Sequence, residues 1–308
     1  MSSIIRHVVD VGQFDRDATL DLFAAADRLR DLPRGSDLLR GYLLATIFYE
    51  PSTRTRLSFE SAMQRLGGGV ISTENAREFS SAIKGETVED TIRIVGGYAD
   101  AIVLRHHEQG AAHRAASVAR VPILNAGDGP GEHPTQALLD LYTIRHELGR
   151  IDGLRVALVG DLRYGRTARS LARLFKLSRG GELIFVSPAQ TPMGEDIRAE
   201  LDAAGVAWRE EPDLARVLPG VDVVYQTRVQ KERFATLADY EAAKGVYIID
   251  RTAMNRLNPG AIVLHPLPRV DEITVEVDAD PRAAYFRQAE NGVYIRMALL
   301  CHVLGVKA

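Results

Sequence analysis

Short apolar runs alternate with segments of helical periodicity along this 308-residue chain, and this alternation constrains its fold more than any other feature. In the first half the runs predict strands at residues 43–48, 70–72, 101–105 and 121–125. In the second half they predict strands at residues 155–159, 183–186, 221–226, 246–249 and 261–264. Strands separated by helices at this spacing are typical of parallel sheets with right-handed crossovers, in which ligands bind at the carboxyl ends of the strands.

The length of the chain favours two domains, each large enough to bury a core of its own. A helix over residues 134–148 is followed by a glycine-flanked segment at residues 149–153, which has the composition of a hinge. We therefore expect an α/β protein with two doubly wound parallel-sheet domains, residues 1–149 and 150–308, joined by this helix and hinge. The apolar final helix, from about residue 281, is expected to pack back on the first domain.

Composition excludes several classes of function. The net charge is −3, from 38 basic and 41 acidic residues, so the chain as a whole does not attract nucleic acid or an anionic membrane. Cys301 is the only cysteine and lies in an apolar run, which predicts a buried thiol with no disulfide and no metal. No apolar run approaches the ~20 residues that span a bilayer, and no signal peptide is recognised. These observations predict a cytoplasmic protein.

The segment that follows the first predicted strand has the features of an anion site. Pro51 ends the strand, Ser52 suits a helix N-cap, and a helix is predicted from Thr53 onward. Hydroxyl groups and the Arg54 guanidinium then lie beside backbone N–H groups that have no partner within the helix. The alternative interpretation is a well-capped surface helix with solvated arginines.

Four arginines, Arg54, Arg105, Arg166 and Arg228, each follow a predicted strand or open a predicted helix. Parallel sheets gather ligand-binding groups at these positions, and a guanidinium pairs well with phosphate and carboxylate. Polar side chains are interleaved with them: Thr53, Thr55, His133, Gln136, Thr167 and Gln230. Together they indicate substrates with several negative charges. Pro134 suits the first helical position, so His133 is also a candidate helix cap with no further role.

Residues 160–167 follow a strand and open a helix, as the phosphate loop of a nucleoside-triphosphate enzyme does. That rival function is weakened because Arg166 stands where the loop lysine would be. No convincing acidic metal ligand accompanies the loop, and its glycine spacing does not match a dinucleotide fingerprint.

Three motifs resemble the aspartate/ornithine carbamoyltransferase family. They are Ser-Thr-Arg-Thr-Arg at residues 52–56, His-Pro-Thr-Gln at 133–136 and Thr-Arg-Val-Gln-Lys-Glu-Arg at 227–233. The resemblance extends from Phe48 to Leu300, and the third motif matches the members that use aspartate. The Ser-Met-Gly motif of the ornithine enzymes is absent, and His-Pro-Leu-Pro at 265–268 stands where their cysteine motif would lie. Gly131, Glu132 and Tyr164 depart from the family pattern.

The resemblance implies transfer of the carbamoyl group of carbamoyl phosphate to the amine of L-aspartate. The products are N-carbamoyl-L-aspartate and phosphate, in the pyrimidine pathway. The alternatives are transfer to another amino acid such as ornithine, or a catalytically silent scaffold of the same fold. The intact family arginines argue against the scaffold.

The resemblance also implies which residues act. Carbamoyl phosphate would be bound by Ser52, Thr53, Arg54, Thr55, Ser80, Arg105, His133, Gln136, Leu267 and Pro268. Aspartate would be bound by Lys84, Arg166, Thr167, Arg228 and Gln230. Catalysis by positioning and charge stabilisation would rest on Arg54, Thr55, Lys84, Arg105, His133 and Gln136. Glu50 would pair with Arg166 and Arg233 when the domains close.

Finally, the resemblance implies a homotrimer with shared active sites, in which Ser80 and Lys84 come from the neighbouring subunit. Regulatory chains or a dihydroorotase are further partners that the family allows. Neither a cofactor nor a metal is expected.

Overall fold

The computed structural model describes residues 6–32, 35–76, 85–228, 236 and 245–308. Contacts divide the chain into two compact units, residues 1–139 with 290–308 and residues 140–289. The division falls inside helix α6 (Pro134–Leu148) rather than at the expected hinge. The expected domain limits of 1–149 and 150–308 therefore stay a prediction, whereas the expectation of two parallel-sheet α/β domains is confirmed.

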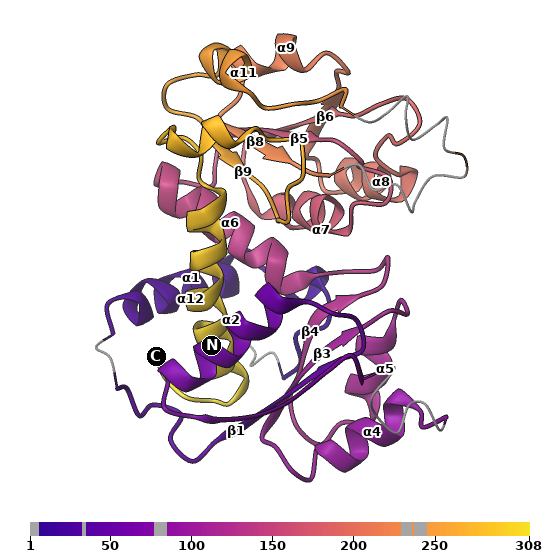
Figure 1. Cartoon of the computed structure of the whole chain (residues 1–308), viewed down its shortest axis with the longest axis vertical. Helices are drawn as coiled ribbons and strands as arrows, with labels where there is room; N and C mark the ends of the chain where they lie inside the picture. Colours follow the sequence, from indigo (N-terminus) through magenta and orange to yellow (C-terminus); the bar gives the residue numbers. More distant parts are fainter. Residues whose placement is uncertain (1–5, 33–34, 77–84, 229–235, 237–244) are drawn as a thin grey trace. The chain divides into compact units, whose positions relative to one another are not determined.

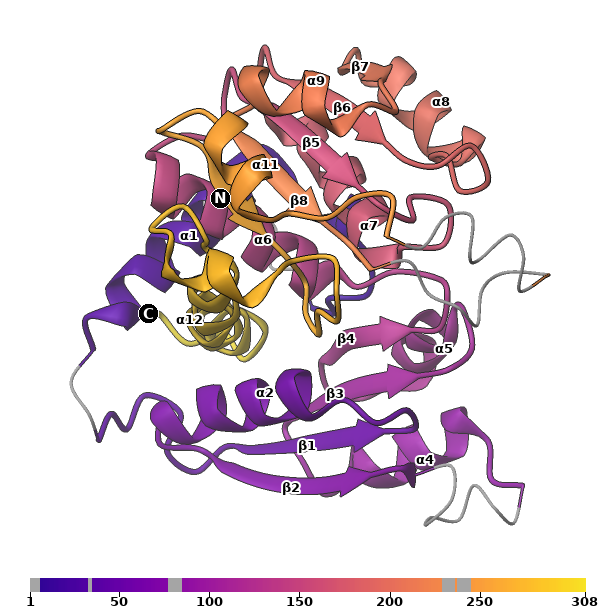
Figure 2. The same ribbon diagram turned by 45° about the horizontal axis from the view of Figure 1, so that its top comes forward.

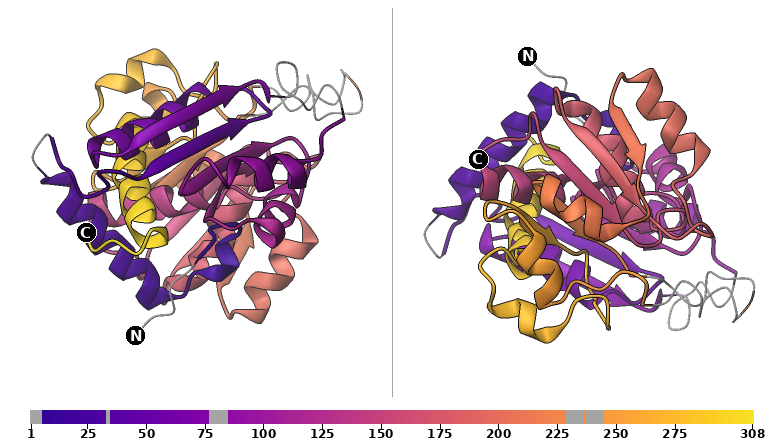
Figure 3. Two further views of the ribbon diagram at one scale, coloured as in Figure 1. Left: turned by 90° about the horizontal axis from the view of Figure 1, so that it is seen from below. Right: turned by 90° about the horizontal axis from the view of Figure 1, so that it is seen from above.

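The first unit contains a four-stranded sheet of β1 (Leu43–Phe48), β2 (Gly69–Glu74), β3 (Ala101–His106) and β4 (Ile123–Asp128). The strands are all parallel and lie in the order β2-β1-β3-β4. Phe48, the last residue of β1, is in register with Glu74 and Arg105, so the strands end together. Figure 3 shows β1 and β2 side by side in the view from below.

Helices cover both faces of this sheet (Figure 2). Helix α2 (Thr53–Arg65) packs on one face through Phe59 and Met63, which are fully buried. The shorter helices α4 (Val88–Val95) and α5 (Ala111–Val118) pack on the other face. Helix α1 (Arg16–Arg30) begins where the Asp15 side chain accepts a hydrogen bond from the Ala18 backbone. A 3-10 helix (Val11–Gln13) precedes it.

The second unit contains a five-stranded parallel sheet in the order β7-β6-β5-β8-β9. Its strands are β5 (Arg155–Val159), β6 (Glu182–Val186), β7 (Ala207–Glu210), β8 (Val223–Gln226) and β9 (Ile262–Leu264). Figure 1 shows α7 (Arg166–Leu174) and α8 (Glu195–Ala203) on one side of this sheet, with α9 (Leu214–Val217) and α11 (Arg251–Arg256) on the other. Three 3-10 helices complete the unit: Phe175–Leu177, Leu218–Gly220 and Val275–Ala279.

The expectation of a strand at residues 246–249 is wrong. Val246 and Ile248 are exposed and alternate with buried Tyr247 and Ile249, so the segment has the pattern of a strand. Within the described part of the chain, however, only Ile249 forms a bridge there, to Ile273. The sequence also gives no sign of β7, because this edge strand is only four residues long, ends in two charged residues and is mostly exposed.

The final helix α12 (Tyr285–Val303) begins later than expected. Ala283 forms a bridge with Val263 of β9, so the chain is still extended where a helix from residue 281 was predicted. Cys301 is buried in this helix, as expected, and burial raises the pKa of its thiol to about 11.

Strand order reverses once in each sheet. The chain starts each sheet in the interior, at β1 or β5, builds outward in one direction and then returns to continue in the other. Ligands bind at this switch point in open parallel sheets, beyond the carboxyl ends of the two strands that flank it. The flanking strands are β1 and β3 in the first unit and β5 and β8 in the second.

Candidate functional site

The start of α2 lies directly after β1, at the switch point of the first unit. Ser52 occupies the N-cap position, but its side chain makes no capping hydrogen bond. The backbone N–H groups of the first turn therefore remain available to an anion, together with the Ser52 and Thr53 hydroxyls. The expected position of Ser52 is confirmed, and the expected cap is not formed.

Arg54 and Arg56 differ although they share one turn of α2. Arg56 is paired with Glu74 of β2 at 2.9 Å and donates a hydrogen bond to Ser72 at 3.1 Å. Arg54 makes no hydrogen bond or ion pair with any residue that the structure describes. Partial burial lowers the pKa of Arg54. Arg54 is thus the member of the pair that is left to bind an anion.

Arg105 reaches this site from the end of β3. Its guanidinium donates a hydrogen bond to the Ala126 carbonyl of β4 at 3.1 Å and lies 3.5 Å from the Glu50 carboxylate. Glu50 follows β1, so the pair spans the ends of the two strands that flank the switch point. Arg105 therefore lies at the carboxyl edge of the sheet, the same edge at which α2 begins with Arg54 in its first turn.

His106, next to Arg105, is not a proton donor at neutral pH. Burial, with a smaller effect of the neighbouring His107, lowers the pKa of His106 to about 4. Its Nδ1 accepts a hydrogen bond from the Glu108 backbone at 3.1 Å, as a neutral imidazole does. The ring packs against Tyr49 with the centroids 4.6 Å apart.

His133 and Gln136 lie at the start of α6, after β4. His133 immediately precedes the helix, and its carbonyl accepts hydrogen bonds from Gln136 and Ala137 at 3.0 and 3.2 Å. Both side chains are buried, with 3% and 9% of their surface exposed. The predicted position of His133 as the residue that begins the helix is confirmed, but whether it also binds substrate stays a prediction.

In the second unit, the ends of β5 and β8 are in close contact. Thr227 follows β8, and both its N–H and its hydroxyl donate to the Val159 carbonyl at 2.8 Å. Gly160 follows β5 with φ +114°, and a Cβ there would lie 2.5 Å from the Thr227 carbonyl oxygen. Only glycine fits this approach, which fixes the positions of the segments that carry Arg166 and Arg228.

Arg166 is the first residue of α7, and Arg228 directly follows Thr227. Both side chains are half-buried. The buried Asp161 carboxylate accepts the Tyr164 N–H at 3.0 Å and stabilises the turn that leads to Arg166. The two arginines are therefore presented at the switch point of this unit, which matches the sequence expectation for their positions.

Leu267 and Pro268 lie in the turn after β9. The Leu267 backbone has φ +50°, which leucine rarely adopts, and the peptide bond to Pro268 is cis. Leu267 N–H donates to His265 Nδ1 at 2.7 Å. The motif at residues 265–268 is thus a defined turn.

The predicted site residues fall into three groups. Those of the first unit are Glu50, Ser52, Thr53, Arg54, Thr55, Arg105, His133 and Gln136. Those of the second unit are Arg166, Thr167, Arg228, Leu267 and Pro268. Ser80, Lys84, Gln230 and Arg233 lie outside the described residues. The pairing of Glu50 with Arg166 and Arg233 stays a prediction, and so do the binding roles of the whole set.

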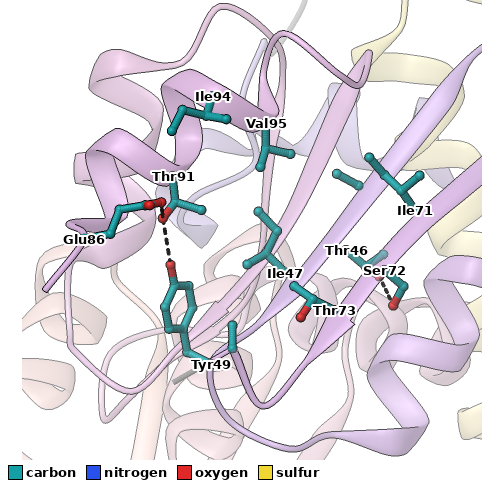
Figure 4. Close-up of a pocket in the computed structure, with 12 residues that line it drawn as sticks. Thr46, Ile47, Tyr49, Ile71, Ser72, Thr73, Glu86, Thr91, Ile94 and Val95 are labelled. Carbon is teal, nitrogen blue, oxygen red and sulfur yellow. Dashed lines mark hydrogen bonds between the residues drawn. The ribbon is translucent and has the colours of Figure 1, made fainter. Parts of the chain in front are cut away.

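A hollow of about 370 Å³ lies between α4 and the face of β1 and β2 (Figure 4). At one end Tyr49 donates to Thr91, whose hydroxyl donates to Glu86 at 2.6 Å. None of the predicted site residues lines this hollow.

The described residues contain neither a metal-binding cluster nor a membrane-spanning helix. No group of three or more His, Cys, Asp or Glu side chains in this part of the chain is arranged to hold a metal ion. Among the helices that the structure describes, none combines the length and the apolar character of a membrane span.

Two family models match the sequence. Residues 6–146 match the carbamoyl-P binding domain of aspartate/ornithine carbamoyltransferases, and residues 152–303 match their Asp/Orn binding domain. A chloroplastic aspartate carbamoyltransferase of Oryza sativa is 59% identical over 95% of this chain and 83% of its own length. The aspartate carbamoyltransferase catalytic subunit of Chromobacterium violaceum is 49% identical over 97% of this chain and 98% of its own.

Solved structures give the same result. The catalytic subunit of M. jannaschii aspartate transcarbamoylase has a TM-score of 0.91 and 46% identity, covering 98% of both chains. The Trypanosoma cruzi aspartate transcarbamoylase in complex with carbamoyl phosphate and aspartate has a TM-score of 0.89 and 42% identity. That match covers 98% of this chain and 97% of the other.

One expectation is wrong in the light of these comparisons. A cytoplasmic location was predicted, but relatives from rice, Arabidopsis and pea, each 59% identical to this chain, are named as chloroplastic. Composition and the lack of a recognised signal peptide do not determine the compartment of such a protein.

Proposed function

We propose a reaction for this chain from one premise: the chain belongs to the aspartate/ornithine carbamoyltransferase family. The chain transfers the carbamoyl group of carbamoyl phosphate to the amine of L-aspartate. The products are N-carbamoyl-L-aspartate and phosphate, in pyrimidine biosynthesis. The observation that carries this function is the placement of arginines at both switch points, Arg54 and Arg105 in one unit and Arg166 and Arg228 in the other.

The first unit binds carbamoyl phosphate. The N–H groups and hydroxyls at the start of α2 and the Arg54 guanidinium hold the phosphate, because Arg54 has no counter-ion among the described residues. Arg105, Thr55 and His133 donate hydrogen bonds to the carbonyl oxygen, where negative charge grows as the tetrahedral intermediate forms. Gln136 and the Leu267 carbonyl hold the carbamoyl amide.

The second unit binds aspartate. Arg166 pairs with the α-carboxylate, while Arg228 and Gln230 pair with the side-chain carboxylate. A guanidinium beside that carboxylate favours aspartate and repels the ammonium group of ornithine. This charge difference decides between the two amino acids that the family uses.

Chemistry proceeds by attack of the aspartate amine on the carbamoyl carbon. The new C–N bond forms, the C–O bond to phosphate breaks, and the departing phosphate accepts the amine proton. His106 does not take that proton, since its Nδ1 already accepts the backbone N–H of Glu108. Catalysis then consists of positioning and charge stabilisation, with no covalent enzyme intermediate.

The proposed assembly is a homotrimer with shared sites, to which the neighbouring subunit contributes Ser80 and Lys84. What supports it is the resemblance to the family, because both residues lie outside the described part of the chain.

The function is tested by assaying carbamoylaspartate formation from carbamoyl phosphate and L-aspartate, with ornithine at the same concentration as the control. We expect aspartate to be carbamoylated and ornithine not. Product from ornithine alone would overturn the assignment of Arg228, and product from neither would overturn the function.

A further inference from the structure

We propose that Asp140 is a positioning residue that holds two substrate-binding segments of the second unit in register. The segments are the start of α7, with Arg166 and Thr167, and the turn at residues 265–268, with Leu267. The inference rests on the proposed function, because it takes these segments to contact substrate. Asp140 itself is fully buried in α6 and is not one of the predicted site residues.

Two branches of hydrogen bonds meet at Asp140 and form one network. The first branch leads from Asp140 to α7. Tyr225 of β8 donates its hydroxyl proton to Asp140 Oδ2 at 2.8 Å, and the Thr167 hydroxyl is hydrogen-bonded to Tyr225 in turn. Burial, together with the charge of Asp140, raises the pKa of Tyr225 far above its ordinary value. The phenol therefore stays protonated and remains a donor, and the side chain next to Arg166 is tied to Asp140.

The second branch leads from Asp140 to the turn after β9. Gln288 Nε2 donates to Asp140 Oδ1 at 2.6 Å, and Gln288 Oε1 accepts the backbone N–H of His265 at 2.8 Å. The amide of Gln288 is thus oriented by its two partners: its nitrogen must face the carboxylate, and its oxygen must face the backbone.

His265 connects Gln288 to Leu267. Its Nδ1 accepts the Leu267 N–H at 2.7 Å, so the proton of the neutral ring is on Nε2, which donates to Glu272 at 2.8 Å. The other Glu272 oxygen accepts the N–H groups of Val270 and Asp271 at 3.1 and 3.2 Å. These contacts hold Leu267 in its uncommon left-handed conformation.

Asp140 joins the branches because each of its oxygens accepts from one of them. Only a carboxylate can do this. An asparagine of the same shape would turn an N–H either toward the Gln288 amide, where two buried donors would meet, or toward the Tyr225 hydroxyl, which would then have to accept instead of donate. Loss of the charge should therefore loosen both segments at once.

Asp140→Asn and Tyr225→Phe test the coupling, with Tyr247→Phe as the matched control. Tyr247 is a largely buried tyrosine of the same unit whose hydroxyl donates to the Pro212 carbonyl, outside the network. Tyr225→Phe cuts only the branch to α7, so we expect KM for aspartate to rise about tenfold. Asp140→Asn should lower kcat/KM for aspartate about a hundredfold. The inhibition constant of inorganic phosphate should change in none of the variants.

The double variant should be no worse than Asp140→Asn alone, since both changes act through one carboxylate. Additive losses, or losses in Tyr247→Phe equal to those in Tyr225→Phe, would overturn the proposal. So would an Asp140→Asn enzyme with a lowered melting temperature but an unchanged KM for aspartate, because that is the result of a purely structural role.

Amide hydrogen exchange provides a readout that needs no substrate. In Asp140→Asn both residues 162–168 and residues 265–270 should exchange faster, whereas in Tyr225→Phe only residues 162–168 should. This pattern tests the network even if the wild-type protein made no carbamoylaspartate, so failure of the proposed function and failure of this inference are distinguishable. Unchanged exchange at either segment in Asp140→Asn would refute the coupling.

Discussion

Arg54 and Arg56 show how much a single residue's role depends on partners that are distant in the sequence. The motif at residues 52–56 contains both arginines, and only Arg54 was predicted to bind phosphate. In the structure Arg56 is paired with Glu74 and Ser72 of β2, which packs against α2. The motif predicted the helix start that carries Arg54, whereas phosphate binding there stays a prediction. The pairing of Arg56 could not be predicted, since it depends on the packing of β2.

This difference predicts that alanine substitution of Arg54 impairs activity, whereas alanine substitution of Arg56 has only a small effect on stability. Arg54→Ala should lower kcat/KM for carbamoyl phosphate by roughly 30- to 5,000-fold, because a charge-assisted pair with the substrate is worth about 2–5 kcal/mol. Its melting temperature should change little. Arg56→Ala is the matched control: its ion pair is partly exposed and contributes about 1 kcal/mol or less to stability. Steady-state kinetics and thermal unfolding of both variants measure the two effects, and equal losses of activity would contradict the assignment.

At the scale of elements, the strands that the sequence predicted correctly are those whose formation depends on burial of apolar residues. Strands buried on both faces, such as β1 and β5, appear as continuous apolar runs. The short, mostly exposed edge strand β7 gives no such signal, and the alternating residues 246–249 give a false one. Pairing with a neighbouring strand decides both cases, and a pairing partner cannot be identified from one segment alone.

The contact between the ends of β5 and β8 also could not be predicted, and it carries a testable consequence. Gly160→Ala should displace Thr227 and with it Arg228, because the new Cβ would lie 2.5 Å from the Thr227 carbonyl oxygen. Together the positive φ and the overlap should lower the free energy of unfolding by roughly 2–5 kcal/mol. We expect KM for aspartate to rise and the inhibition constant of phosphate to stay unchanged.

Gly180→Ala is the control for backbone strain alone. Gly180 also has positive φ, at +65°, but a Cβ there meets no atom within 4 Å. Its variant should lose about 1–2 kcal/mol of stability with aspartate kinetics intact. If the two glycine variants had the same KM for aspartate, the close approach of Gly160 to Thr227 would have no part in binding.

At the scale of the whole molecule, the two units repeat one plan. Each begins its sheet in the interior, reverses strand order once, and places arginines at the ends of the strands that flank the reversal. The alternation of strands and helices and the arginines near strand ends were visible in the sequence. Both sheets could therefore be predicted, and the binding roles of the arginines stay a prediction. The network through Asp140, Tyr225, His265 and Gln288 could not. Its members are far apart in the sequence, and no local pattern marks Asp140, Tyr225 or Gln288.

The proposed trimer predicts recovery of activity in a mixture of two inactive variants. In Arg54→Ala and Lys84→Ala every site of a pure trimer lacks one of the residues proposed to bind substrate. If each site takes Arg54 from one chain and Lys84 from the next, any mixed trimer has one complete site. Random reassembly of equal amounts makes about three quarters of the trimers mixed, so about a quarter of wild-type activity should return.

Arg54→Ala mixed with Arg105→Ala is the matched control for this recovery. Both arginines belong to the unit that binds carbamoyl phosphate and lie at the ends of paired strands of one chain. Every site in that mixture therefore lacks one of them, and activity should stay at the average of the two parents. The same average in the Lys84 mixture, with mixed trimers demonstrated by native mass spectrometry, would show that Lys84 does not act in the neighbouring subunit's site. Recovery in the Lys84 mixture alone would show that the complete site needs two chains.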